Sequence, residues 1–310
     1  MSWRDTSRLA DVQLSRLRVP GERRSLWLAL AVALSAALAG SSCPRRSPAS
    51  ARVVSETVGS DELLLAIAQS GEIAALSDLA IESAYSAVAE QAKAYPRLRR
   101  HGDAEGILKY GPTLVLFANY SRAELVAQVR RAGIRTLVFD QFNTLEDAYA
   151  NLRLLARELG PQAEARAESI IADRGARVEM LRARLSGVAR VRVIAPSIYG
   201  QIPGADSTFQ DLCDHAAADN LATSLGHLRG HAPPPEEQML TWPIDKVVLA
   251  GNDREQALAP FRRVPPYQFM PAIQEGRVAL LSPFQLSCVS QHRVDGYERL
   301  ARELHPEAFR

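Results

Sequence analysis

The sequence predicts an α/β protein with two similar lobes, each with a central parallel sheet, joined by one long helix. Apolar runs of four to five residues alternate with helical segments, which is typical of buried parallel strands. One pattern also occurs twice: a glutamate, a leucine at +3, an aromatic at +5 and an apolar run from +10 to +13, beginning at Glu105 and at Glu237. Residues 160–187 are rich in Ala, Arg and Glu with apolar residues at helical spacing, which predicts the linking helix.

The elements of the first lobe follow from this alternation. In order, they are expected to be a strand at 52–55, a helix at 63–69, a strand at 73–76, an irregular segment at 77–103, a helix at 103–110, strands at 114–118 and 136–139 with a helix between them, and a helix from 144 to 159. The acids Asp61 and Glu62 favour the start of the first helix. Ser121 and Thr144 are predicted N-caps, and Gly133 is a predicted helix stop.

The second lobe is predicted to repeat the scheme. Its expected elements are a strand at 191–195, a Gly/Pro-rich loop at 196–206, a helix at 207–217, a helix that carries Glu237, a strand at 247–250, a helix near 255–261, a strand near 278–281 and a last helix at 294–304. The predicted organisation is therefore a signal peptide at 1–42, a tether at 43–51, an N-terminal α/β lobe at 52–159, a linking helix at 160–188 and a C-terminal α/β lobe at 189–310.

The N-terminus has the pattern of an export signal. Two arginines, Arg23 and Arg24, precede fourteen mostly apolar residues at 26–39, a run shorter than the roughly 20 residues of a membrane span. Small residues then lead to Cys43, a junction that resembles a bacterial lipoprotein cleavage site, although Gly40 stands where leucine is usual. We expect Cys43 to be lipidated; signal cleavage without a lipid remains the alternative, and the true start codon could lie further in.

Charge and cysteine usage exclude some classes of protein. The whole chain has a formal net charge of +2. Residues 1–42 contain six arginines and three acids, so the rest of the chain, the body, has a net charge of −1. A body without basic excess argues against nucleic acid as the main partner. Cys213 and Cys288 could form a disulfide after export or lie buried separately. The sequence contains no Cys-x-x-Cys or Cys/His cluster typical of a structural metal site.

Six segments, in order, resemble the helical-backbone substrate-binding proteins of ABC importers for cobalamin, ferric siderophores and heme. They are Arg52-Val-Val-Ser55 with Glu62-Leu-Leu, Gly102-Asp-Ala-Glu105-Gly-Ile-Leu, Gly133-Ile-Arg-Thr-Leu-Val, Pro235-Glu-Glu237-Gln-Met-Leu, Met270-Pro-Ala-Ile-Gln-Glu-Gly-Arg-Val278 and Leu304-His-Pro306. The resemblance covers about residues 52–306. The chain departs from the family at Pro112-Thr113 and Ile244-Asp245, where Pro-Asp is usual, and it lacks two glycines near 217–220.

The resemblance implies an exported, membrane-anchored lipoprotein, periplasmic or otherwise extracytoplasmic. It implies a monomer without a cofactor of its own, which delivers a ferric siderophore, heme or cobalamin to an ABC permease and its ATPase. Glu105 and Glu237 occupy the positions whose carboxylates contact permease arginines, and a helix-borne carboxylate suits a bidentate Arg contact. Each could instead be a solvated glutamate at a helix N-terminus, and Glu236 could replace Glu237.

Ligand contacts are expected where the strands of the two lobes end. In open α/β sheets, ligands lie outside the carboxyl ends of the strands. Aromatic residues in the loops there are Tyr85, Tyr120, Phe142, Tyr199 and Phe284. Flat rings suit a large macrocycle, and tyrosine hydroxyls can ligate ferric iron; each ring could also be a half-buried loop residue. Arg122 and Arg254 could meet anionic groups, and His292 is a conceivable axial ligand.

Enzymatic function has little support in the sequence. No Gly-x-Ser-x-Gly, phosphate-binding loop or His-Glu-x-x-His motif is present. Two alternatives to transport remain. One is a two-lobed, chelatase-like enzyme that acts on a tetrapyrrole, and the other is a surface protein that keeps the fold without transport.

Overall fold

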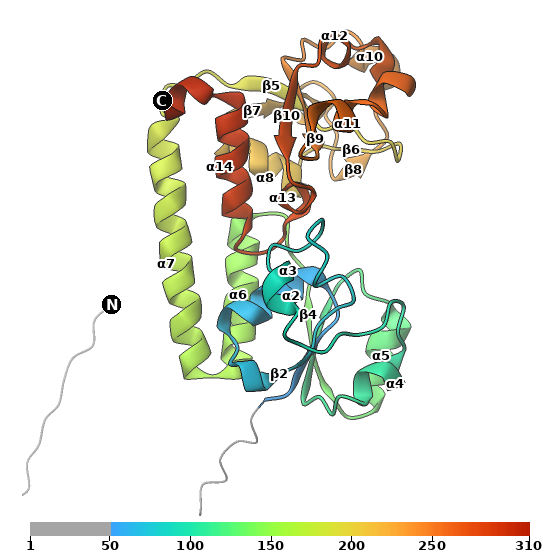
Figure 1. The fold of residues 1–310 in the computed structure, drawn as a ribbon, viewed down its shortest axis with the longest axis vertical. Coiled ribbons are helices and arrows are strands. Elements are labelled where there is room, and N and C mark those ends of the chain that lie inside the picture. Colours follow the sequence, from blue (N-terminus) through green and yellow to red (C-terminus); the bar gives the residue numbers. More distant parts are fainter. Residues whose placement is uncertain (1–50) are drawn as a thin grey trace, which may run out of the picture. The chain divides into compact units, whose positions relative to one another are not determined.

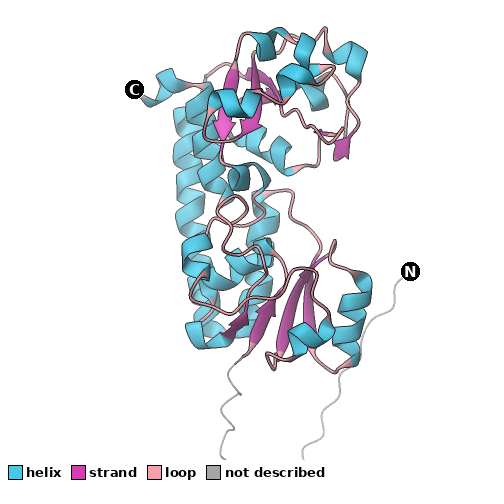
Figure 2. Cartoon of the chain, turned by 45° about the vertical axis from the view of Figure 1, so that its right-hand side comes forward, coloured by secondary structure: helices cyan, strands magenta, loops and turns pink. Residues whose placement is uncertain are grey.

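The computed structural model describes residues 51–310, which contain two separate parallel sheets, each flanked by helices (Figure 2). The predicted signal peptide and the predicted lipidation site at Cys43 lie outside the described residues. The strands of the first sheet are β1 (Val53–Ser55), β2 (Ile73–Ala75), β3 (Leu114–Ala118) and β4 (Arg135–Phe139), in the order β2-β1-β3-β4. Those of the second are β5 (Val191–Ile194), β7 (Ala218–Asn220), β9 (Lys246–Ala250) and β10 (Val278–Leu281), in the order β10-β9-β5-β7.

The two sheets share one topology. When the strands of each sheet are numbered in chain order within their lobe, both sheets have the strand order second, first, third, fourth. Every pair of neighbouring strands is parallel. The match extends to single residues: the Arg52 N–H donates to Thr113 Oγ1 and the Arg192 N–H donates to Asp245 Oδ2, both at 2.9 Å. The predicted α/β fold with two similar lobes is confirmed, and the repeated sequence pattern corresponds to a repeated structure.

The N-terminal sheet has helices on both faces. On one face, Val53, Leu114 and Leu116 pack in a core with α2 (Val58–Ile67), α6 (Leu145–Leu159) and α7 (Pro161–Arg184). On the other, Val115 and Phe117 pack with α4 (Ala104–Leu108) and α5 (Ala123–Arg131). Alternate residues of a strand point to opposite faces, so the fully apolar sequence of β3 is what a strand buried on both faces requires.

The C-terminal sheet is covered in the same way. One face packs against α8 (Thr208–His215) and α14 (Arg293–Leu304). The other is covered by short elements: α9 (Leu221–Ser224), α10 (Glu236–Met239), α11 (Arg254–Leu258), α12 (Pro271–Gln274) and the 3-10 turns Phe261–Arg263 and Tyr267–Phe269. The remaining elements are α3 (Ala89–Ala92), α13 (Pro283–Ser287), a last 3-10 turn at Pro306–Phe309, another at Ser70–Glu72, and an antiparallel pair of β6 (Ile202–Pro203) and β8 (His231–Ala232).

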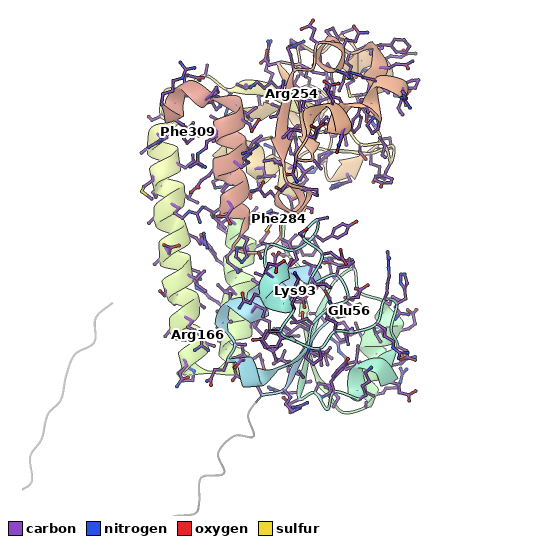
Figure 3. The ribbon with its side chains drawn as sticks, in the orientation of Figure 1. Glu56, Lys93, Arg166, Arg254, Phe284 and Phe309 are labelled. Carbon is purple, nitrogen blue, oxygen red and sulfur yellow. The ribbon has the colours of Figure 1, made fainter. Side chains whose placement is uncertain are left out.

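The link between the sheets is a hairpin of α6 and α7 that turns at Gly160 (Figure 1). Gly160 has φ +96°, a conformation that favours glycine, and Pro161 starts α7 in the first helical position. The start of α7 belongs to the N-terminal lobe, where Arg166, labelled in Figure 3, donates to the Ile67 carbonyl (2.6 Å). Its end packs in the C-terminal core through Leu181. The one helix therefore contributes to both cores.

Two local expectations are corrected. Ser121 does not cap α5: the N-cap is Arg122, and the Ser121 hydroxyl donates to Glu56 (2.6 Å). The strand β7 was not predicted, and it is only three residues long. It follows Ala217, which has φ +51°, a left-handed conformation that glycine adopts more readily.

The two remaining cysteines, Cys213 and Cys288, are free thiols buried at separate places, and they do not form a disulfide. Within residues 51–310, no helix is long and apolar enough to cross a membrane.

Candidate functional site

A cavity of about 800 Å³ opens at the carboxyl end of the N-terminal sheet. Its walls are the residues that follow β1, β2 and β3, the loop at 98–103, and one side of α4. This is the end of a parallel sheet at which ligands bind in open α/β folds. The cavity is also large enough for a ligand of several hundred Å³.

Of the five predicted ligand-binding aromatics, Tyr120 lines this cavity. Tyr120 follows β3, is 61% exposed, and packs edge-on against Phe142 with ring centroids 5.6 Å apart. Tyr85 and Tyr199 are exposed, and Phe284, labelled in Figure 3, is half-buried; these three are not part of the cavity lining. The structure thus places a ring at the cavity wall, with a second ring supporting it.

The cavity lining includes the half-buried residue Glu56, labelled in Figure 3. It accepts a hydrogen bond from Ser121 Oγ (2.6 Å). Burial raises the pKa of Glu56, while the Ser121 hydrogen bond and the nearby Arg122 charge act in the opposite direction. The hydrogen bond thereby joins the loops after β1 and β3, both of which line the cavity.

A fully buried carboxylate positions the loop after β2. Asp61, in the first turn of α2, accepts hydrogen bonds from Ser77 N (3.1 Å) and Ser77 Oγ (2.5 Å). Ser77 and the next residue, Asp78, line the cavity. Burial raises the pKa of Asp61 to about 8, and hydrogen bonds from Ser55 and Ser77 offset only part of that effect.

The neighbouring carboxylate, Glu62, connects the two lobes. It accepts hydrogen bonds from Ser290 Oγ (2.5 Å) and Ala87 N (2.8 Å), and its backbone carbonyl accepts one from Gln291 Nε2 (3.2 Å). Burial raises the pKa of Glu62 as well. One turn of helix therefore fixes the cavity loop through Asp61 and the C-terminal lobe through Glu62. The sequence identified these acids only as helix-start residues, and no local pattern distinguishes a buried pair there from a solvated one.

Of the predicted cationic and histidine ligands, Arg122 lines the cavity, whereas Arg254 and His292 do not. Arg122 donates to the Gly102 carbonyl. Arg254 lies in the other lobe and donates to the Gly276 carbonyl (3.0 Å). His292 is half-buried before α14 with Nδ1 3.8 Å from Asp295 Oδ2. Within residues 51–310, no group of three His, Cys, Asp or Glu side chains is arranged to hold a metal ion.

The two glutamates of the repeated pattern are both exposed and lie one in each lobe, in the first turns of α4 and α10. Glu236, beside Glu237, is exposed too. This placement is compatible with docking and with the alternative of a solvated helix-start glutamate. Glu105 also lines the rim of the cavity, which the sequence did not indicate.

The comparisons with known proteins agree with this architecture. Residues 53–283 match the family model described as "periplasmic binding protein". The chain is similar in structure to the periplasmic heme-binding protein RhuT from Roseiflexus (TM-score 0.71, 21% identity, 84% of this chain and 99% of that one). It is also similar to a periplasmic heme-binding protein from Pseudomonas aeruginosa (TM-score 0.68, 21% identity, 82% of this chain and 92% of that one). A third similar structure is that of the periplasmic vitamin B12-binding protein BtuF of Vibrio cholerae (TM-score 0.64, 17% identity, 84% of this chain and 98% of that one). No match was found among curated proteins.

Proposed function

The chain belongs to the periplasmic binding protein family, and we propose that it binds a ferric siderophore, heme or cobalamin and delivers it to an ABC importer. The observation that carries the proposal is the cavity at the carboxyl ends of β1, β2 and β3, with the Tyr120 ring in its wall. A flat, partly exposed ring supported by a second ring suits a large planar or chelated ligand. The similar structures named for heme and vitamin B12 binding support this range of ligands.

The proposal includes the partners and the location of the protein. Glu105 and Glu237 would contact arginines of the permease, which works with its ATPase. The chain would act outside the cytoplasm as a monomer, held at the membrane by a lipid on Cys43, and it would release its ligand unchanged. Carboxylates on rigid helices mainly steer and orient such an encounter.

Ligand binding should depend on Tyr120. We expect Tyr120→Ala to weaken binding by roughly 1–3 kcal/mol, because a ring in the cavity wall would be lost. Binding is measured by fluorescence quenching with hemin, cyanocobalamin and a ferric siderophore. Tyr199→Ala should weaken binding only if the second lobe also contacts the ligand. Phe269→Ala removes a 58% exposed ring elsewhere and serves as the control.

Two results would count against this assignment. Unchanged affinity in Tyr120→Ala removes that residue from the binding site. No binding of any of the three probes by the wild-type protein removes the proposed ligand classes.

The lipid anchor is tested at Cys43. If the anchor forms, the mature protein begins at Cys43 and partitions with membranes through its acyl chains. The Cys43→Ser variant should appear in the aqueous fraction or remain unprocessed, as read from fractionation and the mass of the N-terminal peptide. Mature protein that keeps residues 1–42 in the cytoplasm would contradict both export and anchoring.

A further inference from the structure

The loop at 98–103 presents three consecutive basic residues to the cavity. Arg99, Arg100 and His101 all line it and are all exposed. Among residues 51–310, no carboxylate lies within 4.0 Å of Arg99, Arg100 or the nearby cavity residue Lys109. Elsewhere in the fold, arginines such as Arg177 form close ion pairs, at 2.7 Å to Asp295. The cavity rim thus concentrates cations that the protein does not neutralise itself.

The cavity lining also contains acidic residues. The lining contains four arginine and lysine residues and four acids, so its formal charge is balanced. Two of the acids already have partners: Glu56 accepts from Ser121 (2.6 Å), and Asp103 caps α4 by accepting from Gly106 N (2.9 Å). The four acids are spread over the segments after β1 and β2 and the start of α4, whereas Arg99 and Arg100 are consecutive on one loop.

The loop is fixed in place. Leu98 N donates to the Leu76 carbonyl (2.8 Å), and Gly102 N closes a turn on the Arg99 carbonyl (2.9 Å). His101 has φ +54°, the left-handed region that non-glycine residues rarely adopt. Arg122 donates to the Gly102 carbonyl from the start of α5. A loop held at both ends by hydrogen bonds presents its cations at a defined position, which lowers the entropic cost of binding.

We propose that the ligand of this cavity carries anionic groups at one edge and that Arg99 and Arg100 bind them. The inference rests on the proposed function and narrows its ligand class. A guanidinium group matches a carboxylate or a catecholate with paired, charge-assisted hydrogen bonds. Heme has two carboxylates at one edge, and a ferric tris-catecholate is anionic, whereas the side chains of cobalamin are amides. The cavity therefore selects heme or an anionic ferric chelate over cobalamin.

The test compares hemin, a ferric tris-catecholate and cyanocobalamin in binding titrations at low and high salt. The wild-type protein should bind one of the anionic complexes at least about tenfold more tightly than cyanocobalamin, with an affinity that falls as salt rises. The double variant Arg99→Glu/Arg100→Glu should weaken binding of that complex by about a hundredfold. Binding by Arg99→Lys/Arg100→Lys should lie between that of the wild type and that of the double glutamate variant, because the charges remain but the paired guanidinium hydrogen bonds are lost.

The matched control is Arg97→Glu, since Arg97 is exposed, lies two residues before Arg99 and is outside the cavity lining. It should leave affinity within about twofold. Circular dichroism spectra confirm that each variant is folded. Equal wild-type affinity for cyanocobalamin and the anionic complexes, or undiminished binding by the double glutamate variant, overturns the inference alone. Failure of the wild type to bind any of the three overturns the proposed function, and the inference with it.

Discussion

Uptake should fall more than about tenfold in a strain that carries Glu237→Arg, because an arginine would then face a permease arginine, and like-charge contacts at an interface cost several kcal/mol. Glu237 is exposed on α10 and lies outside the cavity lining, so ligand affinity should stay at the wild-type value. The reversal therefore separates docking from binding. Transport is measured as uptake of labelled ligand into cells or vesicles that contain the importer.

The equivalent change in the other lobe needs a second measurement. Glu105→Arg should reduce transport as well, and the double variant should be lower than either single one. Because Glu105 lines the cavity rim, its ligand affinity has to be measured in parallel, and uptake compared at saturating ligand. Glu124→Arg is the control, since Glu124 is an exposed glutamate in the first turn of the neighbouring helix α5 and lies outside the cavity lining. Full transport by the double variant would exclude the docking assignment.

The repeat explains why so much of the fold could be predicted from the sequence. Equal spacing from Glu105 and from Glu237 to an apolar strand indicates two copies of one unit, and the two sheets have one topology. Local signals were also reliable where a single backbone conformation is required: Thr144 caps α6, and Gly133 follows α5 with φ +79°. These features depend on residues close together in the chain.

The candidate site could be predicted only in part, because it depends on how loops converge. The rule for strand ends pointed to several loop aromatics, of which Tyr120 lines the cavity, whereas Tyr199 follows a strand in the same way and lies outside the cavity lining. The helix-start acids show the same limit more sharply. The buried carboxylate of Glu62 accepts a hydrogen bond from Ser290, a residue 228 positions away, and no local pattern carries that information. Long-range packing decides whether such a carboxylate is solvated or structural.

The stability of the protein should fall as pH rises from about 4 to 8, because of Asp61. In the folded state its pKa is raised to about 8, while in the unfolded chain it returns to its ordinary value near 3.8. Between these values the folded protein keeps a proton that the unfolded chain loses. The stability contributed by protonated Asp61 is present below pH 4 and is lost as pH rises through the folded pKa, at about 1.4 kcal/mol per pH unit. Asp61 is fully buried, so solvent does not screen the effect.

The Asp61→Asn variant should remove this slope, since asparagine is neutral at every pH and its side-chain oxygen can still accept from Ser77 N. Relative to the wild type, its free energy of unfolding should rise by up to about 4 kcal/mol between pH 5 and pH 8, as measured by urea titration. Asp245→Asn is the control: the bidentate Arg192 pair lowers the pKa of Asp245, so that variant should differ from the wild type equally at both pH values. A constant difference between Asp61→Asn and the wild type would show that Asp61 does not titrate in this range. The helix turn that holds the cavity loop would then be stabilised by an ionised carboxylate rather than a neutral one.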